Sequence, residues 1–421
     1  MPATHPFQQS NKPGGTATIA IVAGEHSGDR LGGKLMTVLN ASLDGPCYVG
    51  VGGEDMAAAG LHSIFPMGEV AVMGPVAIAK RLPSLVRRVY QAVDTIVACE
   101  PDILVIVDSP EFTHPIAKRV RKRLPQVPII DYVSPSVWAW RPGRARKMRR
   151  YIDHVLALLP FEPAAHERLG GPRCTYVGHP LAESIEWVHE LDPDPLRNSL
   201  GLADDSPVAV VLPGSRPSEV ARLAPVFGQA LGELIERSGP LQVIVPTVES
   251  VREQVAAATA IWPVTPHFIL DETDKFRAFR LARAALAASG TVSLELGVAG
   301  TPMVVAYIVE PLATVLRLVI KAPSIVLANL VLERNAFPEF IQEDCTAPNL
   351  AAALSDLLND SPERARQLTA LQEFETRLAL PGTTPSRAAA QVVIDHLQQG
   401  VRPRKLASDS DPSSAPFKAE F

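Results

Sequence analysis

Asp108 is the residue best placed for acid–base chemistry in this sequence. It follows the uninterrupted apolar run Ile103–Val107 and begins the turn Asp108-Ser109-Pro110. A carboxylate fixed at the end of a buried strand can take the proton of a hydroxyl group that attacks a sugar. The structural alternative is that Asp108 caps a helix that begins near Thr113.

Two later turns carry groups suited to a nucleotide. Ser215 and Arg216 follow Gly214 after an apolar run, and a guanidinium held there can form paired hydrogen bonds with a phosphate. The turn Ser289-Gly290-Thr291 opens a helix in which Glu295 lies four residues after Thr291. Glu295 therefore shares the face of the turn and can accept ribose hydroxyls. The alternatives are a surface arginine and a capped helix with an exposed glutamate.

The first strand-to-helix turn lies in Ile21–Asp29. Gly24 and Gly28 let backbone N–H groups approach a ligand closely, and a helix N-terminus favours an anion. The spacing is not G-x-G-x-x-G, which makes a nicotinamide site weak. A tight turn in which Ser27 or Asp29 caps the helix fits equally well.

The densest positive charge follows two tryptophans. Trp138 and Trp140 precede a basic cluster formed by Arg141, Arg144, Arg146, Lys147, Arg149 and Arg150. This combination suits sugar stacking, phosphate binding or an anionic membrane surface. A solvated helix face over packed tryptophans is the structural alternative. Nucleic acid is disfavoured, because the net charge is −5.

Alternating apolar runs and amphipathic stretches must position these turns. Runs without a polar residue are typical of strands buried on both faces of a parallel sheet. We expect strands at Thr18–Ala23, Cys47–Val51, Ile103–Val107, Ile129–Val133, Val155–Leu159, Cys174–Val177, Val208–Leu212, Leu241–Val245, Phe268–Leu270, Ala284–Ala288 and Met303–Tyr307, with helices such as Ser218–Arg237 and Asn349–Asn359. The βαβα rhythm predicts an α/β protein of two Rossmann-like doubly wound domains.

The length of 421 residues suits two such domains. The rhythm restarts after Leu191–Pro195, which predicts domains at 16–190 and 191–385. Residues 386–400 are expected to form a C-terminal helix that returns to the first domain. The compositions of 1–15 and 401–421 predict disordered tails.

Metal and membrane-spanning signals are weak. The four cysteines, Cys47, Cys99, Cys174 and Cys345, have no metal-ligand spacing, so we expect no metal and a reducing compartment. The N-terminus lacks the pattern of a signal peptide. The apolar stretch Met303–Leu332 is interrupted by charges and prolines and is a poor membrane span.

A docking surface for a membrane is nevertheless predicted. Val70–Ala79 is strongly apolar and is followed by Lys80, Arg81, Arg87 and Arg88. An apolar insertion beside a basic rim is the pattern of a reversible interfacial anchor. The alternative is a helix packed on its own sheet with its charges in water.

Taken together, the motifs resemble those of the lipid A disaccharide synthases. The blocks occur in the family's order, and Tyr132–Arg141 is the most specific: Ala23–Asp29, Gly50–Gly53, Met73-Gly74, Asp108–Pro110, Tyr132–Arg141, Leu159–Glu162, Val177–Pro180, Leu212–Arg216, Ser289–Glu295 and Pro302–Val305. The resemblance spans roughly residues 18–398.

The resemblance implies a metal-independent, cofactor-free GT-B glycosyltransferase of lipopolysaccharide biosynthesis. It would join UDP-2,3-diacylglucosamine to 2,3-diacylglucosamine 1-phosphate (lipid X) with inversion, giving the lipid A disaccharide 1-phosphate and UDP. It would be a cytoplasmic protein, peripheral on the anionic inner face of the inner membrane, with a homodimer as one assembly. The first domain would hold the acceptor and face the membrane, and the second would bind the UDP-sugar.

The resemblance also suggests roles for residues. Asp108 is the candidate base, Arg216 the diphosphate contact and Glu295 the ribose contact. Asn329 and Gln342 match polar positions near the nucleotide sugar. The chain departs from the family pattern at Glu111, Thr113 and Ala328, which flank these sites.

Two other functions stay open at this point. A UDP-sugar epimerase of the same architecture would release free sugar and need no lipid. A non-catalytic lipid- or nucleotide-binding relative would have lost its chemistry, against which stand the retained Asp108, Arg216 and Glu295.

Overall fold

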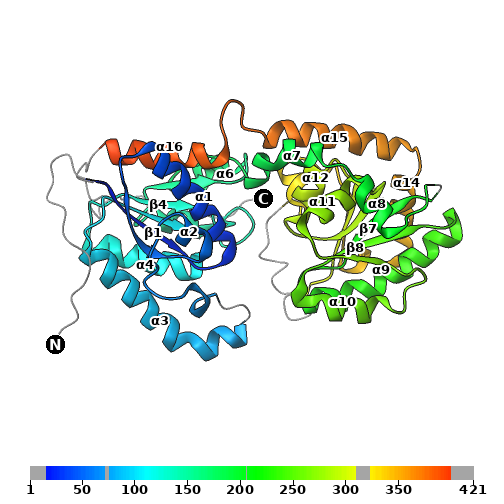
Figure 1. Cartoon of the computed structure of the whole chain (residues 1–421), viewed down its shortest axis with the longest axis horizontal. Coiled ribbons are helices and arrows are strands. Elements are labelled where there is room, and N and C mark those ends of the chain that lie inside the picture. Colours follow the sequence, from blue (N-terminus) through cyan, green and yellow to red (C-terminus); the bar gives the residue numbers. More distant parts are fainter. Residues whose placement is uncertain (1–15, 72–74, 205, 310–322, 400–421) are drawn as a thin grey trace, which may run out of the picture. The chain divides into compact units, whose positions relative to one another are not determined.

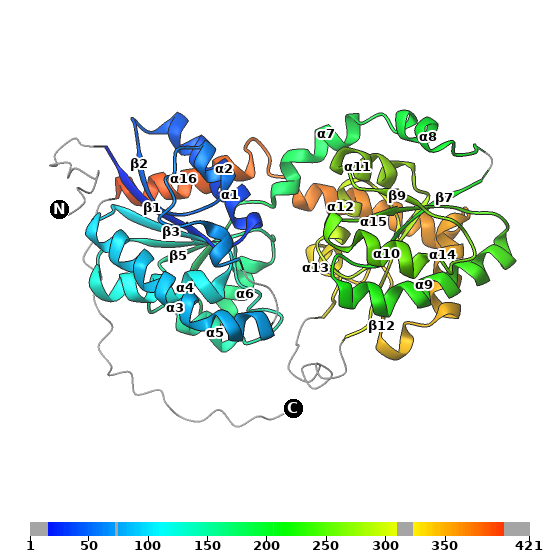
Figure 2. The same ribbon diagram turned by 60° about the horizontal axis from the view of Figure 1, so that its bottom comes forward.

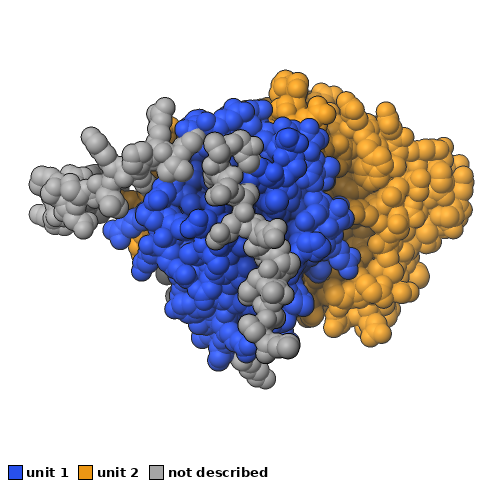
Figure 3. Space-filling view, turned by 60° about the vertical axis from the view of Figure 1, so that its left-hand side comes forward, with its two compact units in different colours: residues 1–132, 150–154, 389–421 blue, residues 133–149, 155–388 orange. Residues whose placement is uncertain are grey.

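The computed structural model describes residues 16–71, 75–204, 206–309 and 323–399, without the side chains of 75–80. These residues group into two compact units, coloured separately in Figure 3. One unit contains the residues up to Tyr132, Arg150–His154 and the residues from Ala389 on. The other contains Val133–Arg149 and Val155–Ala388. The boundary near residue 190 stays a prediction.

The first sheet has six strands in the order β2-β1-β3-β4-β5-β6. Its strands are β1 (Thr18–Ala23), β2 (Cys47–Val51), β3 (Ile103–Val107), β4 (Ile129–Tyr132), β5 (His154–Ala157) and β6 (Arg173–Tyr176). β1 pairs in parallel with both β2 and β3. The crossover from β1 to β2 contains α1, and the crossover from β2 to β3 contains α3 and runs the opposite way along the sheet. Right-handed crossovers that run in opposite directions place their helices on opposite faces of the sheet, as Figure 2 shows for α1 and α3.

The helices of this half of the sequence connect the strands and follow the last one. They are α1 (His26–Ser42), α2 (Glu54–Ala58), α3 (Pro75–Ala98), α4 (Pro110–Arg123), α5 (Gly143–Met148), α6 (Glu162–Arg168), α7 (Ile185–Glu190) and α8 (Asp194–Leu200).

The second sheet also has six strands, in the order β12-β11-β10-β7-β8-β9. They are β7 (Val208–Leu212), β8 (Gln242–Pro246), β9 (His267–Ile269), β10 (Ala284–Ala288), β11 (Met303–Tyr307) and β12 (Glu339–Ile341). The helices are α9 (Pro217–Ser238), α10 (Arg252–Thr259), α11 (Glu272–Leu281), α12 (Val292–Val298), α13 (Leu327–Leu332), α14 (Ala347–Leu358), α15 (Pro362–Leu378) and α16 (Pro385–Gln398) (Figure 1).

Alternate residues of β7 explain why its sequence is apolar throughout. Val208, Val210 and Leu212 pack into one core with α11, α12 and α15. Ala209 and Val211 pack into another with α9, α10 and α14. Both faces of the strand are therefore buried, as the uninterrupted apolar run predicts.

Residues from Ala389 on group with the first unit. His396 of α16 lies beside His154 of β5, with Nε2 3.1 Å from Nδ1. The C-terminal helix thus contributes a side chain to the unit that contains β1–β4.

Two predicted segments fall partly outside the described residues. Of the apolar stretch Met303–Leu332, the first five residues form β11 and residues 310–322 are not described. The predicted docking segment Val70–Ala79 is described only in part, and residues 1–15 and 401–421 not at all. The described part of the chain contains no helix that could span a bilayer.

Candidate active site

The first sheet reverses its strand order between β1 and β3, and ligands of doubly wound folds bind outside the carboxyl ends of strands at such a point. Ala23 is paired with Val107, so the residues that follow β1 and β3 emerge side by side. The Gly24–Asp29 turn and Asp108 therefore belong to one site.

Asp108 is half-buried and fixed by several bonds. Its Oδ1 accepts the N–H of Ser109 at 2.8 Å, and its Oδ2 accepts the hydroxyl of Ser27 at 2.9 Å. Both Asp108 and Ser109 adopt left-handed backbone conformations, with φ of 53° and 44°. α4 begins at Pro110 with no side-chain cap. The cap interpretation of Asp108 is therefore wrong, because its carboxylate holds the β1–α1 turn instead.

Thr113 explains one departure from the family pattern. It is fully buried, and its hydroxyl donates to the carbonyl oxygens of Asp108 at 2.8 Å and of Ser109 at 3.1 Å. The Thr113 hydroxyl thus stabilises the left-handed backbone of Asp108 and Ser109. Glu111, the other departure in this turn, is exposed.

Glu25 is a residue of this site that the sequence reasoning missed. Burial first, and then the negative charge of Asp108, raise the pKa of Glu25, whose carboxyl hydrogen-bonds with the side chains of Asp108 and Ser109. A carboxyl that holds its proton longer can donate to the Asp108 carboxylate. The sequence did offer a signal for Glu25, because the Gly24–Asp29 turn contains this second acidic residue beside Asp29.

The glycines of this turn are explained by close packing. A Cβ at Gly28 would lie 3.0 Å from the carbonyl oxygen of Val107 and 3.6 Å from the Cβ of Asp108. A Cβ at Gly24 would lie 2.9 Å from that of Ser109. Contact of Gly28 with a substrate stays a prediction.

Neither Ser27 nor Asp29 caps α1, whose N-cap is Glu25 without a side-chain bond. Asp29 is buried and instead accepts the N–H groups of Gly53, Asp55 and Met56 at 2.6, 3.0 and 3.2 Å. It therefore holds the Gly50–Gly53 motif against α1.

The second sheet reverses its order between β7 and β10. Leu212 is paired with Ala287 and Ala288 with Ala306, so the Gly214–Arg216 turn, the Ser289–Thr291 turn and Tyr307 follow adjacent strands. The structure thus brings the two turns that were predicted to bind the nucleotide to one edge of one sheet, beside Tyr307 at the end of β11.

Glu219 organises the Gly214–Arg216 turn. Its carboxylate is buried and accepts the N–H of Ser215 and the guanidinium of Arg216, each at 3.1 Å. The Tyr307 hydroxyl also hydrogen-bonds with Glu219; burial and this carboxylate raise the pKa of Tyr307. Arg216 keeps 66% of its side chain exposed and is held at one nitrogen, which leaves donors for an anion. Glu219 follows this motif in the first turn of α9 and was not predicted as a site residue.

Ser289 and Glu295 have partners on other elements. The Ser289 hydroxyl donates to the carbonyl oxygen of Ile325 at 2.8 Å. Glu295 Oε2 lies 3.1 Å from Lys275 Nζ, and both side chains are about a quarter exposed. Gly290 and Thr291 complete the turn, with Thr291 exposed. Glu295 is therefore accessible, and a ribose would meet a lysine beside it.

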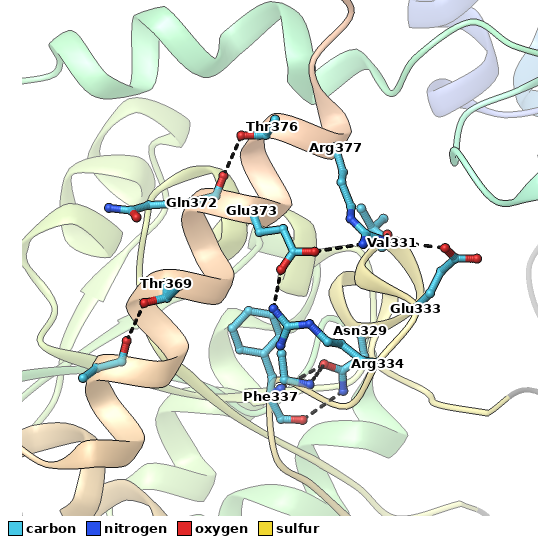
Figure 4. Close-up of polar contacts among 12 residues, drawn as sticks. Asn329, Val331, Glu333, Arg334, Phe337, Thr369, Gln372, Glu373, Thr376 and Arg377 are labelled. Atoms are coloured by element: carbon cyan, nitrogen blue, oxygen red, sulfur yellow. Dashed lines mark hydrogen bonds and ion pairs between the residues drawn. The ribbon is translucent and has the colours of Figure 1, made fainter.

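Asn329 is buried in α13, and its amide bonds to residues that precede and follow this helix (Figure 4). Its Nδ2 donates to the Phe337 carbonyl at 2.9 Å, and its Oδ1 accepts the N–H groups of Ala336 and Phe337 at 2.9 Å each. The same Nδ2 lies 3.3 Å from Ser324 Oγ, next to the Ile325 that Ser289 contacts. Asn329 therefore joins Ser324 to the backbone of Ala336 and Phe337; its direct contact with the nucleotide sugar stays a prediction.

Gln342 follows β12 with a φ of 54°. Its Oε1 accepts the N–H of Val309 at 2.6 Å, just beyond the end of β11. The Gln342 side chain is half-buried at the carboxyl edge of the sheet. This position is compatible with the predicted contact, which stays untested.

Arg141 ends the Tyr132–Arg141 block. Its guanidinium carbon lies 4.1 Å from the ring centroid of Trp140, and its side chain is exposed. Trp138 instead packs edge-on against Phe161, with centroids 5.2 Å apart. The two tryptophans therefore have different partners: Trp138 packs against Phe161, and Trp140 packs against the guanidinium of Arg141.

A cavity of about 400 Å³ lies elsewhere, lined by Arg334, Asn335, Ala336, Pro338, Ala353, Asp356, Glu363 and Arg366. These residues precede β12 or belong to α14 and α15, at the amino edge of the sheet. Ion pairs that join Arg334 and Arg377 to Glu373 lie close to it (Figure 4). The cavity is therefore separate from the candidate nucleotide site. Among the described residues no cluster of His, Cys, Asp or Glu could hold a metal ion.

Comparison with known proteins shows the affiliation of the chain. Residues 19–393 match the profile of the family described as "Lipid-A-disaccharide synthetase". A lipid-A-disaccharide synthase of Rhodopseudomonas palustris (strain HaA2) is 49% identical over 92% of this chain and 98% of its own. That of Nitrobacter hamburgensis is 50% identical over 91% of this chain and 96% of its own.

Solved structures share the GT-B fold at low sequence identity. A UDP-GlcNAc 2-epimerase from Neisseria meningitidis bound to UDP-GlcNAc has a TM-score of 0.60 at 10% identity and covers 91% of this chain and 100% of its own. A glycosyltransferase from Rickettsia africae has a TM-score of 0.56 at 10% identity and covers 91% of this chain and 98% of its own. At such identities the likeness concerns the fold alone.

Proposed function

Since the chain belongs to the lipid-A-disaccharide synthetase family, we propose that it joins UDP-2,3-diacylglucosamine to 2,3-diacylglucosamine 1-phosphate in lipid A biosynthesis. The products are the disaccharide 1-phosphate and UDP. The observation that carries this proposal is the fixed Asp108 carboxylate at the β1–β3 switch point, beside Ser27 and Glu25.

Asp108 supplies the base. The acceptor's 6-hydroxyl loses its proton to Asp108 as its oxygen forms a bond to the anomeric carbon, and the bond from that carbon to the UDP oxygen breaks. A single displacement of this kind inverts the anomeric configuration. Ser27 and the Ser109 N–H hold the carboxylate, so that little reorganisation is needed when the hydroxyl arrives.

The leaving UDP carries the electron pair and needs positive charge. Arg216 supports this role because Glu219 orients its guanidinium while 66% of the side chain stays exposed. Glu295 would accept the ribose hydroxyls, with Lys275 Nζ 3.1 Å from its carboxylate. Ser215, Ser289, Gly290 and Thr291 line the same strand ends and would surround the diphosphate.

The epimerase alternative shares the fold but not the sequence. Solved epimerases of this fold are 10–14% identical to the chain, against 49–50% for the two synthases named above. Family membership therefore favours glycosyl transfer to a lipid over release of a free sugar.

The direct test incubates the purified chain with both substrates and follows lipid and sugar products by mass spectrometry. A disaccharide 1-phosphate together with one UDP for each turnover supports the proposal, and NMR of the new linkage reports inversion. Free sugar formed without the acceptor would instead identify an epimerase, and no turnover would identify a binding protein.

Both proposed substrates are acylated, and α3 supports their capture at a membrane surface. Leu82, Val86 and Tyr90 recur every four residues along the helix and are 54%, 45% and 50% exposed. Arg81 and Arg87 are exposed beside them. An apolar stripe with a basic rim suits an anionic bilayer surface.

Arg88 does not belong to this rim. Its Nε donates to Glu69 at 2.7 Å, and its guanidinium lies 5.0 Å from the Phe65 ring centroid. A docking test therefore leaves Arg88 intact and compares Arg81→Ser/Arg87→Ser with Leu82→Ser/Val86→Ser in flotation on anionic vesicles. Each pair should reduce flotation without changing UDP binding. Unchanged flotation in both would place docking elsewhere. The homodimer stays a prediction that light scattering can test.

A further inference from the structure

The Tyr132–Arg141 block begins and ends in strained backbone. Val133 has a φ of 90° and Arg141 a φ of 54°. A β-branched residue at positive φ is an outlier that persists only where the surroundings enforce it, and such residues gather at functional sites. The first residue of the block is Tyr132, whose carbonyl accepts the N–H of Asp108 at 2.9 Å.

A buried carboxyl group holds the block. Glu162 is 3% exposed and accepts the N–H groups of Leu158 and Leu159 at 3.1 and 3.0 Å. Its second oxygen accepts the indole N–H of Trp138 at 3.2 Å. Ser134, which also hydrogen-bonds with Glu162, lies 2.9 Å from His166 Nε2. Two points of the block are thereby fixed to the β5–α6 turn.

The anchoring leaves one end of the block available to a ligand. Trp140 and Arg141 follow the anchored Trp138. The guanidinium of Arg141 lies over the Trp140 ring, and Arg141 is exposed. Within the described ranges no carboxylate pairs with Arg141. An unpaired guanidinium stacked on an indole presents planar donors for a phosphate beside an apolar surface for a sugar ring.

We propose that the Trp140–Arg141 pair binds the phosphate-bearing sugar of the acceptor, and that Glu162 is the positioning residue that holds this pair in place. The inference rests on the proposed function and extends it, because it assigns the acceptor's phosphate to a specific guanidinium and identifies a residue that acts through Trp138. No substrate atom touches Glu162 in this arrangement.

The first test measures KM for donor and acceptor separately in the full-length enzyme carrying Arg141→Ala. We expect the acceptor KM to rise about 10–100-fold, because a charged set of hydrogen bonds is lost, while the donor KM and UDP affinity stay within about twofold. Arg146→Ala is the matched control, since it removes the same charge from an exposed position of α5. Equal acceptor KM values in the two variants would overturn the assignment.

The second test concerns the anchor. Glu162→Gln places an amide N–H₂ group against N–H donors, and Trp138→Phe removes only the indole N–H while keeping a ring against Phe161. Both should raise the acceptor KM, the second by about 2–10-fold, and leave the donor KM unchanged. If Glu162→Gln does not fold, the acceptor KM of Trp138→Phe still tests whether the Trp138–Glu162 bond positions the Trp140–Arg141 pair. Equal changes in both KM values, or none, would assign Glu162 a purely structural role and overturn this part.

The phosphate bound by Arg141 could belong to the acceptor or to a lipid headgroup of the membrane. A short-chain, water-soluble acceptor distinguishes these two sources, because it can be assayed without a membrane. A KM defect of Arg141→Ala that persists with this acceptor supports the proposal. A defect that vanishes with it, together with lost flotation on anionic vesicles, would assign Arg141 to the membrane instead. If the parent enzyme turns over both substrates, the proposed function is supported whether Arg141 binds the acceptor or the membrane.

Discussion

Replacing Asp108 with asparagine is the sharpest perturbation of the candidate site. The amide oxygen can still accept the Ser109 N–H, and the amide N–H₂ group can donate to the Ser27 hydroxyl, which rotates to accept. Both bonds now measure 2.8 and 2.9 Å, so an isosteric side chain fits them. We therefore expect the free energy of unfolding to change by less than about 1 kcal/mol.

The chemical step should suffer far more. Asparagine cannot take a proton, and loss of a general base slows turnover about 10²–10⁴-fold, which corresponds to about 3–5 kcal/mol in the barrier. The variant should also lower the pKa of Glu25, because the charge of Asp108 is one of the causes that raise it. The loss at the reaction centre thus exceeds the loss in the fold several times over.

The assay compares kcat of parent and variant, with UDP affinity measured by calorimetry and folding by circular dichroism. Glu111→Gln is the control, since it makes the same carboxyl-to-amide change at an exposed position of the same turn. Turnover of correctly folded Asp108→Asn within about threefold of the parent would refute the role of Asp108 as base. An equal loss of kcat in Glu111→Gln would show that the effect is not specific to Asp108.

Three further outcomes are expected. Arg216→Ala should weaken UDP binding about 10–100-fold in calorimetry, because the diphosphate loses an oriented guanidinium; Arg216→Lys should recover little, and unchanged affinity would contradict this contact. Glu295→Gln should raise the donor KM with little change in kcat, whereas Lys275→Met should act less; the reverse order would remove Glu295 from the ribose site. Burial raises the pKa of Glu162 from 4.5 to about 7, so its contribution to stability is fully present below pH 4.5 and is lost as the pH rises through 7, by about 3 kcal/mol in all. Denaturant titrations of the parent and Glu162→Gln should therefore diverge between pH 5 and 8 by that order of magnitude, and parallel curves would contradict the raised pKa.

Much of the sheet architecture could be predicted from the sequence. The expected ranges of β1, β2, β3, β7, β10 and β11 agree with the structure to the residue, because strands buried on both faces appear as unbroken apolar runs. β12 was missed because Glu339–Ile341 is short and begins with a glutamate at the edge of the sheet. α4 begins at Pro110, three residues before the expected start; proline at the first helical position was the signal overlooked.

The buried acids of the sites were harder to predict. Asp29 accepts N–H groups 24 to 27 residues away, and Glu25 meets Asp108 across two strands. Such partners are set by strand order and register, which motif spacing does not contain. Glu219 and Glu162 bind residues three or four positions away, but each also has a distant partner, Tyr307 and Trp138 respectively. Only the tertiary structure shows these partners and the burial of both carboxyl groups.

The left-handed pair Asp108-Ser109 has a consequence for how the protein can vary. Two non-glycine residues in this conformation each cost about 1–2 kcal/mol, comparable to a sizeable part of the stability margin of a single domain. Glycine at 109 would remove part of that cost, but it would also free the peptide whose N–H orients the carboxylate of residue 108. A substitution at position 109 that raises the thermal stability is therefore expected to lower the activity. A search for thermostable variants that spares activity should avoid the turn and draw its gains from the buried strands and helix surfaces behind it.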